Sequence, residues 1–213
     1  MTCRGFTLVE VLVVIAIIAI LGGLSMAGWQ VAQETAYVNA EKHAITMIKV
    51  AIGNFGREWG DPPPNSLGIW KVKGNSINEG NESLFAHLQA RKRNGPFLTD
   101  DGVDEDRWQN ADGDKLSAGD LKKIRQSLNW TRTGNQLLEY TDFWGNPYVY
   151  IPREGYGKKF QYQDSLGRTF QVEASKNSQT GEYYAPTTFQ LWSLGPDGEN
   201  QNGGGDDVCS WKF

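Results

Sequence analysis

The sequence predicts an α+β fold in which one long N-terminal α-helix packs on a small antiparallel β-sheet, with extra helices and loops inserted between them. Three observations lead to this prediction: an apolar N-terminal stretch that continues into an amphipathic helix, a middle with two short helical patterns, and a C-terminal part rich in aromatic and β-branched strand patterns. The 213 residues are enough for one ordinary domain with appendages.

Composition and charge exclude several classes of function. The formal net charge is -4 and no long basic block occurs, so nucleic acid is not an expected partner. The two cysteines, Cys3 and Cys209, and the two histidines, His43 and His87, stand apart from any metal-ligand or catalytic-triad spacing. We therefore expect no catalytic residues and no enzymatic activity.

The apolar stretch at residues 6–26 is long enough to cross a membrane. It has about 21 residues, or about 31 Å as a helix, which matches the hydrocarbon core of a bilayer. Its single carboxylate, Glu10, would cost roughly 2.5–3.5 kcal/mol there, and such residues are usually functional. We expect a single-pass helix with a cytoplasmic N-terminus, and we expect Glu10 to need a partner.

Two plainer interpretations of the N-terminus stay open on the residues alone. In the first, Arg4 begins a secretory signal peptide that is cut after Ser25-Met26-Ala27, before Gly28. In the second, the same stretch is an uncleaved signal anchor. Neither interpretation explains Glu10, and N-terminal sequencing of the mature chain distinguishes them.

The helical pattern continues beyond the apolar stretch. Apolar residues recur every seven positions, and glycines followed by three prolines then end the pattern. We expect one helix over residues 6–56, followed by a globular head over residues 57–213. The residues of the predicted stripe are Val31, Val38, Ile45, Ile48, Ile52 and Phe55.

The middle of the chain, residues 61–139, is predicted to be a variable insertion. Residues 82–92 show a short helical pattern with Leu84, Phe85 and Leu88 on the inner face, and residues 117–128 show another. Ser117 followed by Asp120 is a variant of the capping box that begins helices.

An acidic stretch lies between these two helices. Asn110, Asp112 and Asp114 have the alternating spacing of the first ligands of an EF-hand, but the sixth and twelfth places hold Lys115 and Leu121. We therefore expect a solvated acidic loop over residues 100–120, with a cation site as the alternative.

Residues 140–213 are predicted to hold the sheet and a C-terminal loop. Residues 142–150 begin with a turn and run into a strand, and residues 159–173 and 183–194 are two further strand candidates. Near the end, Asp197, Asp206 and Asp207 flank a glycine-rich link. On the residues alone this segment is a turn followed by a flexible loop.

The segment Gly5-Phe6-Thr7-Leu8-Val9-Glu10 resembles the N-terminal signal of type IV pilins and of the related type II secretion pseudopilins. The resemblance implies a pilin-like fold, with a leader over residues 1–5 that prepilin peptidase removes by cutting between Gly5 and Phe6. It also implies N-methylation of Phe6 and a filament in which Glu10 pairs with the Phe6 amine of a neighbouring subunit. The expected partners are copies of this chain, other pseudopilins and an inner-membrane secretion platform, with the head in the periplasm.

Two C-terminal segments make the resemblance more specific. Residues 142–150 resemble the D-x-W-G-x-P-Y-x-Y stretch, and residues 193–211 resemble the S-L-G-x-D-G and D-D-[IV]-x-x-W ending, of the type II secretion major pseudopilin. That ending binds one calcium ion in the family. Carried over, the side chains of Asp197, Asp206 and Asp207 and the main-chain oxygens of Leu194 and Glu199 would hold the ion. Leader removal would leave Cys209 as the one thiol, so no disulfide is expected.

These observations predict a structural subunit of a type II secretion pseudopilus. One alternative is a type IV pilin or minor pilin that serves adhesion or DNA uptake. Another, of a different class, is a membrane-anchored carbohydrate-binding or hydrolytic domain that uses exposed aromatic side chains and acidic pairs. Its candidate aromatic residues are Trp59, Trp70, Trp108 and Trp130.

Overall fold

A computed structural model describes residues 7–72, 74–99, 103–129 and 134–213, with the backbone alone for residues 22–28 and 30. The chain forms two compact units, Met1–Asn39 and Ala40–Phe213, and each is described by itself. The predicted leader and the cleavage site between Gly5 and Phe6 lie outside the described residues.

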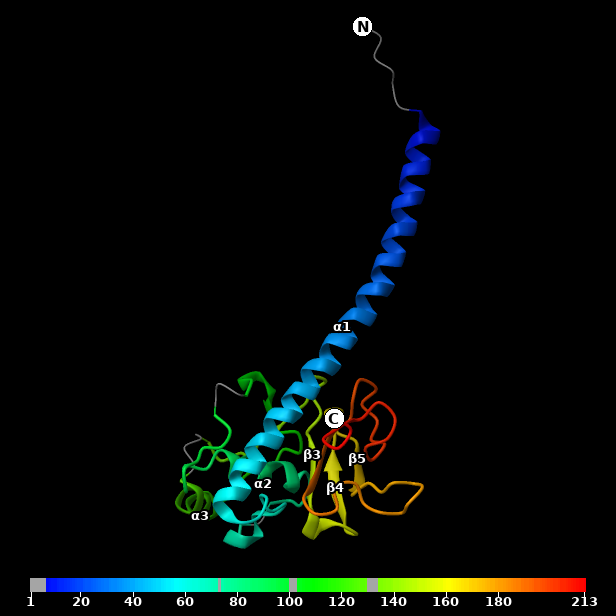
Figure 1. The fold of residues 1–213 in the computed structure, drawn as a ribbon. Coiled ribbons are helices and arrows are strands. Elements are labelled where there is room, and N and C mark those ends of the chain that lie inside the picture. Colours follow the sequence, from blue (N-terminus) through cyan, green and yellow to red (C-terminus); the bar gives the residue numbers. More distant parts are fainter. Residues whose placement is uncertain (1–6, 73, 100–102, 130–133) are drawn as a thin grey trace. The chain divides into compact units, whose positions relative to one another are not determined.

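The predicted long helix is present as α1, Leu8–Trp59 (Figure 1). It ends later than the expected Gly56, because Phe55 and Trp59 stack at 5.3 Å between ring centroids and extend the packed face by one turn. Gly60 then takes a φ of 96°, which favours glycine, while its amide donates to the Gly56 carbonyl at 2.8 Å. The glycines at 53 and 56 do not stop the helix.

The first unit contains the apolar part of α1. Its described side chains are exposed, and Leu8, Ile15 and Ile20 show 80%, 58% and 63% of their surface. Among the residues that the structure describes, no helix combines the length and hydropathy needed to cross a membrane.

The second unit builds its core on the last part of α1. Ile45, Ile48, Ile52 and Phe55 are all buried, so the predicted stripe is confirmed over this range. Phe55 packs edge-on against the rings of His87 and Phe97 at 5.6 and 5.5 Å. The earlier part of the stripe differs, because Val31 is 67% exposed within the first unit.

Two helices follow in the middle of the chain. The first, α2, spans Glu79–Leu88 instead of the expected 82–92, and the predicted inner residues Leu84, Phe85 and Leu88 are buried. It stops at Leu88 because the chain turns back there: the amides of Phe97 and Leu98 donate to the Leu88 carbonyl. The second, α3, spans Ala118–Leu128.

The start of α3 confirms the predicted capping box. The Asp120 amide donates to Ser117 Oγ at 3.1 Å, and Ser117 Oγ donates to Asp120 Oδ2 at 2.8 Å. Short 3-10 turns complete the helical elements: η1 Leu67–Trp70, η3 Glu105–Arg107 and η4 Arg153–Gly155.

The strands form three small antiparallel sheets within the described residues, where we expected one. Residues 159–173 make a hairpin instead of one strand, because Asp164 Oδ1 accepts the amides of Leu166 and Arg168 and turns the chain. The expected strand over residues 183–194 shortens to 189–193. The sheets are β1 Trp108–Gln109 with β2 Glu139–Tyr140; β3 Val149–Pro152, β6 Phe189–Ser193 and β7 Val208–Cys209; and β4 Lys159–Gln163 with β5 Thr169–Glu173.

A second hydrophobic cluster lies among the C-terminal strands. It includes Val149, Tyr162, Trp192 and Cys209, all buried. Cys209 is a free thiol whose pKa burial raises to about 12, so it stays protonated and packs as a small apolar group. The segment 61–139 belongs to the second unit, and its helix α2 contacts both β2 and β3.

Candidate functional site

Glu10 has a partner within its own chain. The Thr7 amide and hydroxyl donate to Glu10 Oε2 at 2.9 and 2.8 Å, and the Glu10 amide donates to Thr7 Oγ1 at 3.3 Å. This reciprocal arrangement is a capping box, which satisfies amides that the first turn of a helix leaves unpaired. The Thr-x-x-Glu spacing carries this signal, although we did not predict it from the sequence.

The C-terminal loop, residues 194–207, connects β6 to β7. Its two ends lie close together: a Cβ on Gly195 would fall 2.6 Å from the Asp206 carbonyl oxygen, so only glycine fits there. The Asp197 amide donates to Asp206 Oδ2 at 3.2 Å. Two of the three predicted carboxylate ligands therefore belong to residues that contact each other.

The third predicted carboxylate, Asp207, serves the backbone of the loop. Only 3% of its surface is exposed, and its Oδ2 accepts the amides of Gln201 at 3.1 Å and Gly203 at 2.7 Å. Its Oδ1 is buried without a hydrogen-bond partner. Burial, which outweighs these two hydrogen bonds, raises the pKa of Asp207 to about 7.

The remaining predicted ligands fit a metal only in part. Asp197 accepts the Glu199 amide at 2.8 Å and the Gln201 side-chain amide at 3.0 Å, while the Glu199 carboxylate pairs with Arg168 at 2.5 Å. Leu194 is buried at the end of β6. The carboxylates of Asp197, Asp206 and Asp207 do not gather within 4.8 Å of one another. The loop therefore offers one oxygen without a hydrogen-bond partner, Asp207 Oδ1, but no complete set of metal ligands.

A different set of carboxylates does gather. Across the described ranges, the one group of three or more metal-binding side chains with ligand atoms within 4.8 Å is Glu82, Asp112 and Asp114, here called the acidic cluster. Glu82 is 2% exposed, and Asp112 and Asp114 are half-buried. The expectation of a solvated loop is therefore wrong at Asp112 and Asp114, because both face a carboxylate on α2.

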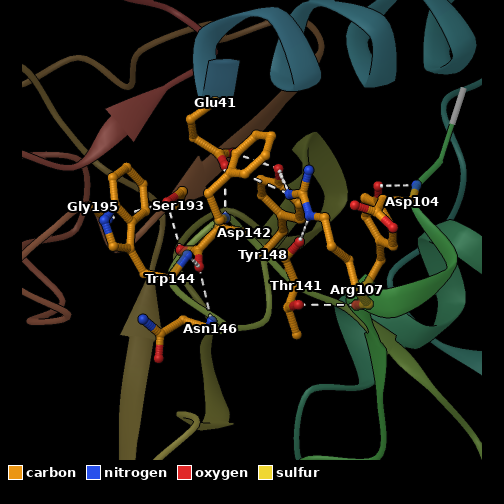
Figure 2. Close-up of polar contacts among 12 residues, drawn as sticks. Glu41, Asp104, Arg107, Thr141, Asp142, Trp144, Asn146, Tyr148, Ser193 and Gly195 are labelled. Carbon is orange, nitrogen blue, oxygen red and sulfur yellow. Dashed lines mark hydrogen bonds and ion pairs between the residues drawn. The ribbon is translucent and has the colours of Figure 1, made fainter. Parts of the chain in front are cut away.

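A buried polar network joins the last part of α1 to the segment 141–148 (Figure 2). Glu41, which is fully buried, accepts hydrogen bonds from the Tyr148 hydroxyl and from the Phe143 amide, the latter at 3.1 Å. Arg107 lies 3.6 Å from Glu41 and donates to Tyr148 Oη at 2.6 Å and to the Thr141 carbonyl at 2.7 Å.

Asp142 continues this network toward β6. Its Oδ1 accepts the amides of Trp144 and Asn146 at 2.9 and 2.8 Å, and its Oδ2 accepts the Ser193 hydroxyl at 2.6 Å (Figure 2). Burial raises the pKa of Glu41 to about 7 and that of Asp142 to about 6.

The two network carboxylates are not arranged as a catalytic pair. Every oxygen of Glu41 and Asp142 has a partner, and neither carboxylate has room for a substrate, since they are 0% and 1% exposed. The network instead fixes how α1 meets the segment around β3 and β6. Arg107 was not singled out from the sequence, because its partners lie far along the chain.

Comparison with known families gives a match at the N-terminus. The family model described as the prokaryotic N-terminal methylation motif matches residues 1–26. Searches of curated proteins and of solved structures give no match. The match supports a type IV pilin-like protein, anchored in the membrane, processed by prepilin peptidase and assembled into a filament.

Proposed function

We propose that this chain is a pseudopilin, a structural subunit of a type II secretion pseudopilus that drives protein export. The observation that carries the proposal is the methylation motif at residues 1–26 with Glu10 as its one carboxylate in an apolar stretch. The secretion branch is favoured by the resemblance at residues 142–150 and 193–211. The subunit would lie in the inner membrane with its head in the periplasm.

Glu10 would exchange partners during assembly. In the single chain its carboxylate is held at the start of α1 by Thr7, so it is preorganised at the helix end. Cleavage after Gly5 would create a positively charged amine on Phe6. In the low dielectric of packed apolar helices, an amine from a neighbouring subunit favours the ionised carboxylate far more than a hydroxyl does.

Calcium in the C-terminal loop is part of the proposal. Supporting it are the buried, unpartnered Oδ1 of Asp207 and the contact between Asp197 and Asp206. The main-chain oxygens of Leu194 and Glu199 would complete the set, and calcium takes six to eight oxygens at about 2.3–2.6 Å. An ion there would order a loop with three consecutive glycines that no disulfide closes.

Substitution of Glu10 tests the function. We expect Glu10→Leu to insert in the membrane and to be processed, as N-terminal sequencing would show, but to give no filaments by electron microscopy and no secretion. Glu34→Gln, an exposed carboxylate of α1 outside the motif, is the matched control and should assemble normally. Normal filaments from Glu10→Leu, or a mature chain that begins at Gly28, would contradict the proposal.

The carbohydrate-binding alternative gains no support from its candidate aromatic residues. Trp59 stacks on Phe55 and lies under the Arg93 guanidinium. Trp70 packs against His87, and Trp108 packs against Phe85 and Tyr140. Trp130 lies outside the described residues. A type IV pilin role is distinguished by phenotype: loss of the gene would abolish adhesion or DNA uptake while protein secretion continues.

A further inference from the structure

The acidic cluster joins two segments that are distant in the sequence. Glu82 comes from the first turn of α2, whereas Asp112 and Asp114 come from the loop that follows β1. Their carboxylate oxygens lie within 4.8 Å of one another, which is the spacing expected for oxygens around a shared cation.

Most oxygens of this cluster are buried without hydrogen-bond partners, although Asp112 Oδ1 accepts the Asp114 amide at 3.2 Å. Both carboxylate oxygens of Glu82 are in this state, as are Asp112 Oδ2, Asp114 Oδ1 and Asn110 Oδ1. Glu82 itself is 98% buried, since 2% of its surface is exposed. Buried polar atoms are almost always paired, so the unpaired carboxylate oxygens of the cluster indicate a missing positive partner.

Electrostatics point to the same conclusion. Within the described parts of the chain, no lysine or arginine forms an ion pair with any member of the cluster. Protein charge therefore does not compensate these acids there.

The loop that carries the two aspartates is held in place by other groups. The Asn110 side-chain amide donates to the Asp114 carbonyl at 2.9 Å, which leaves the Asn110 Oδ1 free. The Ala111 amide donates to Glu139 Oε2 at 3.0 Å, and the Ala111 carbonyl accepts from Gln163 at 2.7 Å. The oxygens are thus presented by a fixed backbone, which lowers the entropic cost of binding an ion.

The position of Glu82 explains the incomplete EF-hand pattern at residues 110–114. Asn110, Asp112 and Asp114 supply alternating oxygens, as the first half of an EF-hand loop does, but the carboxylate required at the twelfth place is missing. Glu82 provides a carboxylate with both oxygens open, from a helix instead of from the same loop.

We propose that Glu82, Asp112 and Asp114, with the side-chain oxygen of Asn110, bind a calcium ion in the head, separate from the C-terminal loop. Calcium suits this set better than magnesium, because it accepts more oxygens, including both of one carboxylate, and tolerates irregular geometry. The ion ties α2 to the loop after β1.

Calorimetric titration with calcium chloride tests the site on the full chain in detergent micelles, after treatment with chelator. We expect Glu82→Gln to lower the number of calcium ions bound per chain by one, and Asp114→Asn to weaken that binding at least tenfold. Asp106→Asn removes an exposed carboxylate from the same acidic stretch and is the matched control, which should bind as the parent does.

Asp207→Asn separates this site from the C-terminal loop. If only the acidic cluster binds calcium, the parent binds one ion, which Asp207→Asn retains and Glu82→Gln loses. This result would contradict the calcium site in the C-terminal loop but would support the site at the acidic cluster. Calcium binding that is unchanged in both Glu82→Gln and Asp114→Asn, or a parent that binds no calcium, would overturn the proposal. Glu82→Gln keeps the side-chain volume and removes a buried charge, so the variant is expected to fold, and circular dichroism checks this.

Discussion

The C-terminal loop and the acidic cluster both gather carboxylates, but these carboxylates make different contacts. In the loop, Asp207 accepts two backbone amides with one oxygen and leaves the other open. In the cluster, Glu82 accepts nothing with either oxygen. The loop thus uses its acid to hold its own backbone, whereas the cluster has in Glu82 an acid for which the described protein offers no donor.

The difference matters for how each region responds to the absence of metal. A carboxylate that accepts backbone amides stabilises the fold by itself, and removal of the carboxylate leaves those amides unpaired. A buried carboxylate without donors destabilises the fold until a cation compensates it. Stability measured with and without calcium therefore separates the two regions.

Asp207→Ala should give the largest effect. Without metal, we expect the free energy of unfolding to fall by about 3 kcal/mol, because the Gln201 and Gly203 amides lose a charged acceptor worth about 1.5–3 kcal/mol each. Urea unfolding in chelator measures this loss. Asp206→Ala, which removes one exposed acceptor, is the control and should lose less than 1 kcal/mol. Equal stability of Asp207→Ala and the parent would contradict the structural role of this carboxylate.

Glu82→Met should have the opposite sign. Without metal, we expect stabilisation by about 2 kcal/mol, because a methionine of similar volume fills the site and no buried acid is left unpaired. With calcium, the parent should gain stability and the variant should not. Thermal unfolding in chelator and in calcium measures both effects. A Glu82→Met variant that is less stable than the parent in chelator would show that Glu82 has a stabilising partner in the protein.

Glu41 provides a reference carboxylate that is buried yet fully partnered. Its pKa is raised to about 7 by burial and by Asp142, so between the ordinary value of 4.5 and about 7 the folded state holds a proton that the unfolded state has lost. The contribution of Glu41 to the free energy of unfolding is therefore present at low pH and falls as the pH rises through that window. The slope is at most about 1.4 kcal/mol per pH unit and falls to about half of that at the pKa of the folded state, so from pH 5.5 to 7 we expect a loss of about 1.5 kcal/mol.

Glu41→Gln should remove the share of the pH dependence that Glu41 contributes, while the shares of Asp142 and Asp207 remain, and it should not alter the calcium response. Urea unfolding at several pH values in chelator compares the variant with the parent. If the parent instead becomes more stable as the pH rises through this window, and the variant does not, Glu41 is ionised throughout and the Arg107 pair dominates. The comparison between loop and cluster would then need a different reference.

Local patterns predicted much of the fold. The inner face of α2 and the Ser117 to Asp120 cap were predicted because the residues that determine them lie within a few positions of one another. The Thr7 to Glu10 cap is equally local and could have been predicted from its spacing. The hairpin at 159–173 was missed because its turn is made by the Asp164 side chain, within a segment whose strand pattern looks continuous.

The candidate sites were harder to predict because their partners are distant in the sequence. Glu82 meets Asp112 across 30 positions of chain, and nothing in the spacing of either segment reports the other. Likewise, Glu41 and Arg107 become partners only when α1 packs on the segment 141–148. The spacing at residues 110–114 predicts candidate ligand oxygens, but only the tertiary structure shows which further carboxylate faces them.

Arg168 offers the smallest and most specific test of the comparison. It donates to the buried Asp164 at 2.5 Å, to the exposed Glu199 at 2.5 Å and to the Gly198 carbonyl at 2.9 Å, so a protein cation already contacts the C-terminal loop. Because 44% of the Arg168 side chain is exposed, Arg168→Ala should lower the stability of the fold only slightly. In a Glu82→Gln background, only the C-terminal loop is expected to bind calcium. There, calorimetry should show that Arg168→Ala raises the calcium affinity of the loop about twofold, since a competing positive charge is gone. In an Asp207→Asn background, affinity at the acidic cluster should not change. A loss of affinity in the first background would instead mean that Arg168 positions the main chain at Gly198 and Glu199 for the ion.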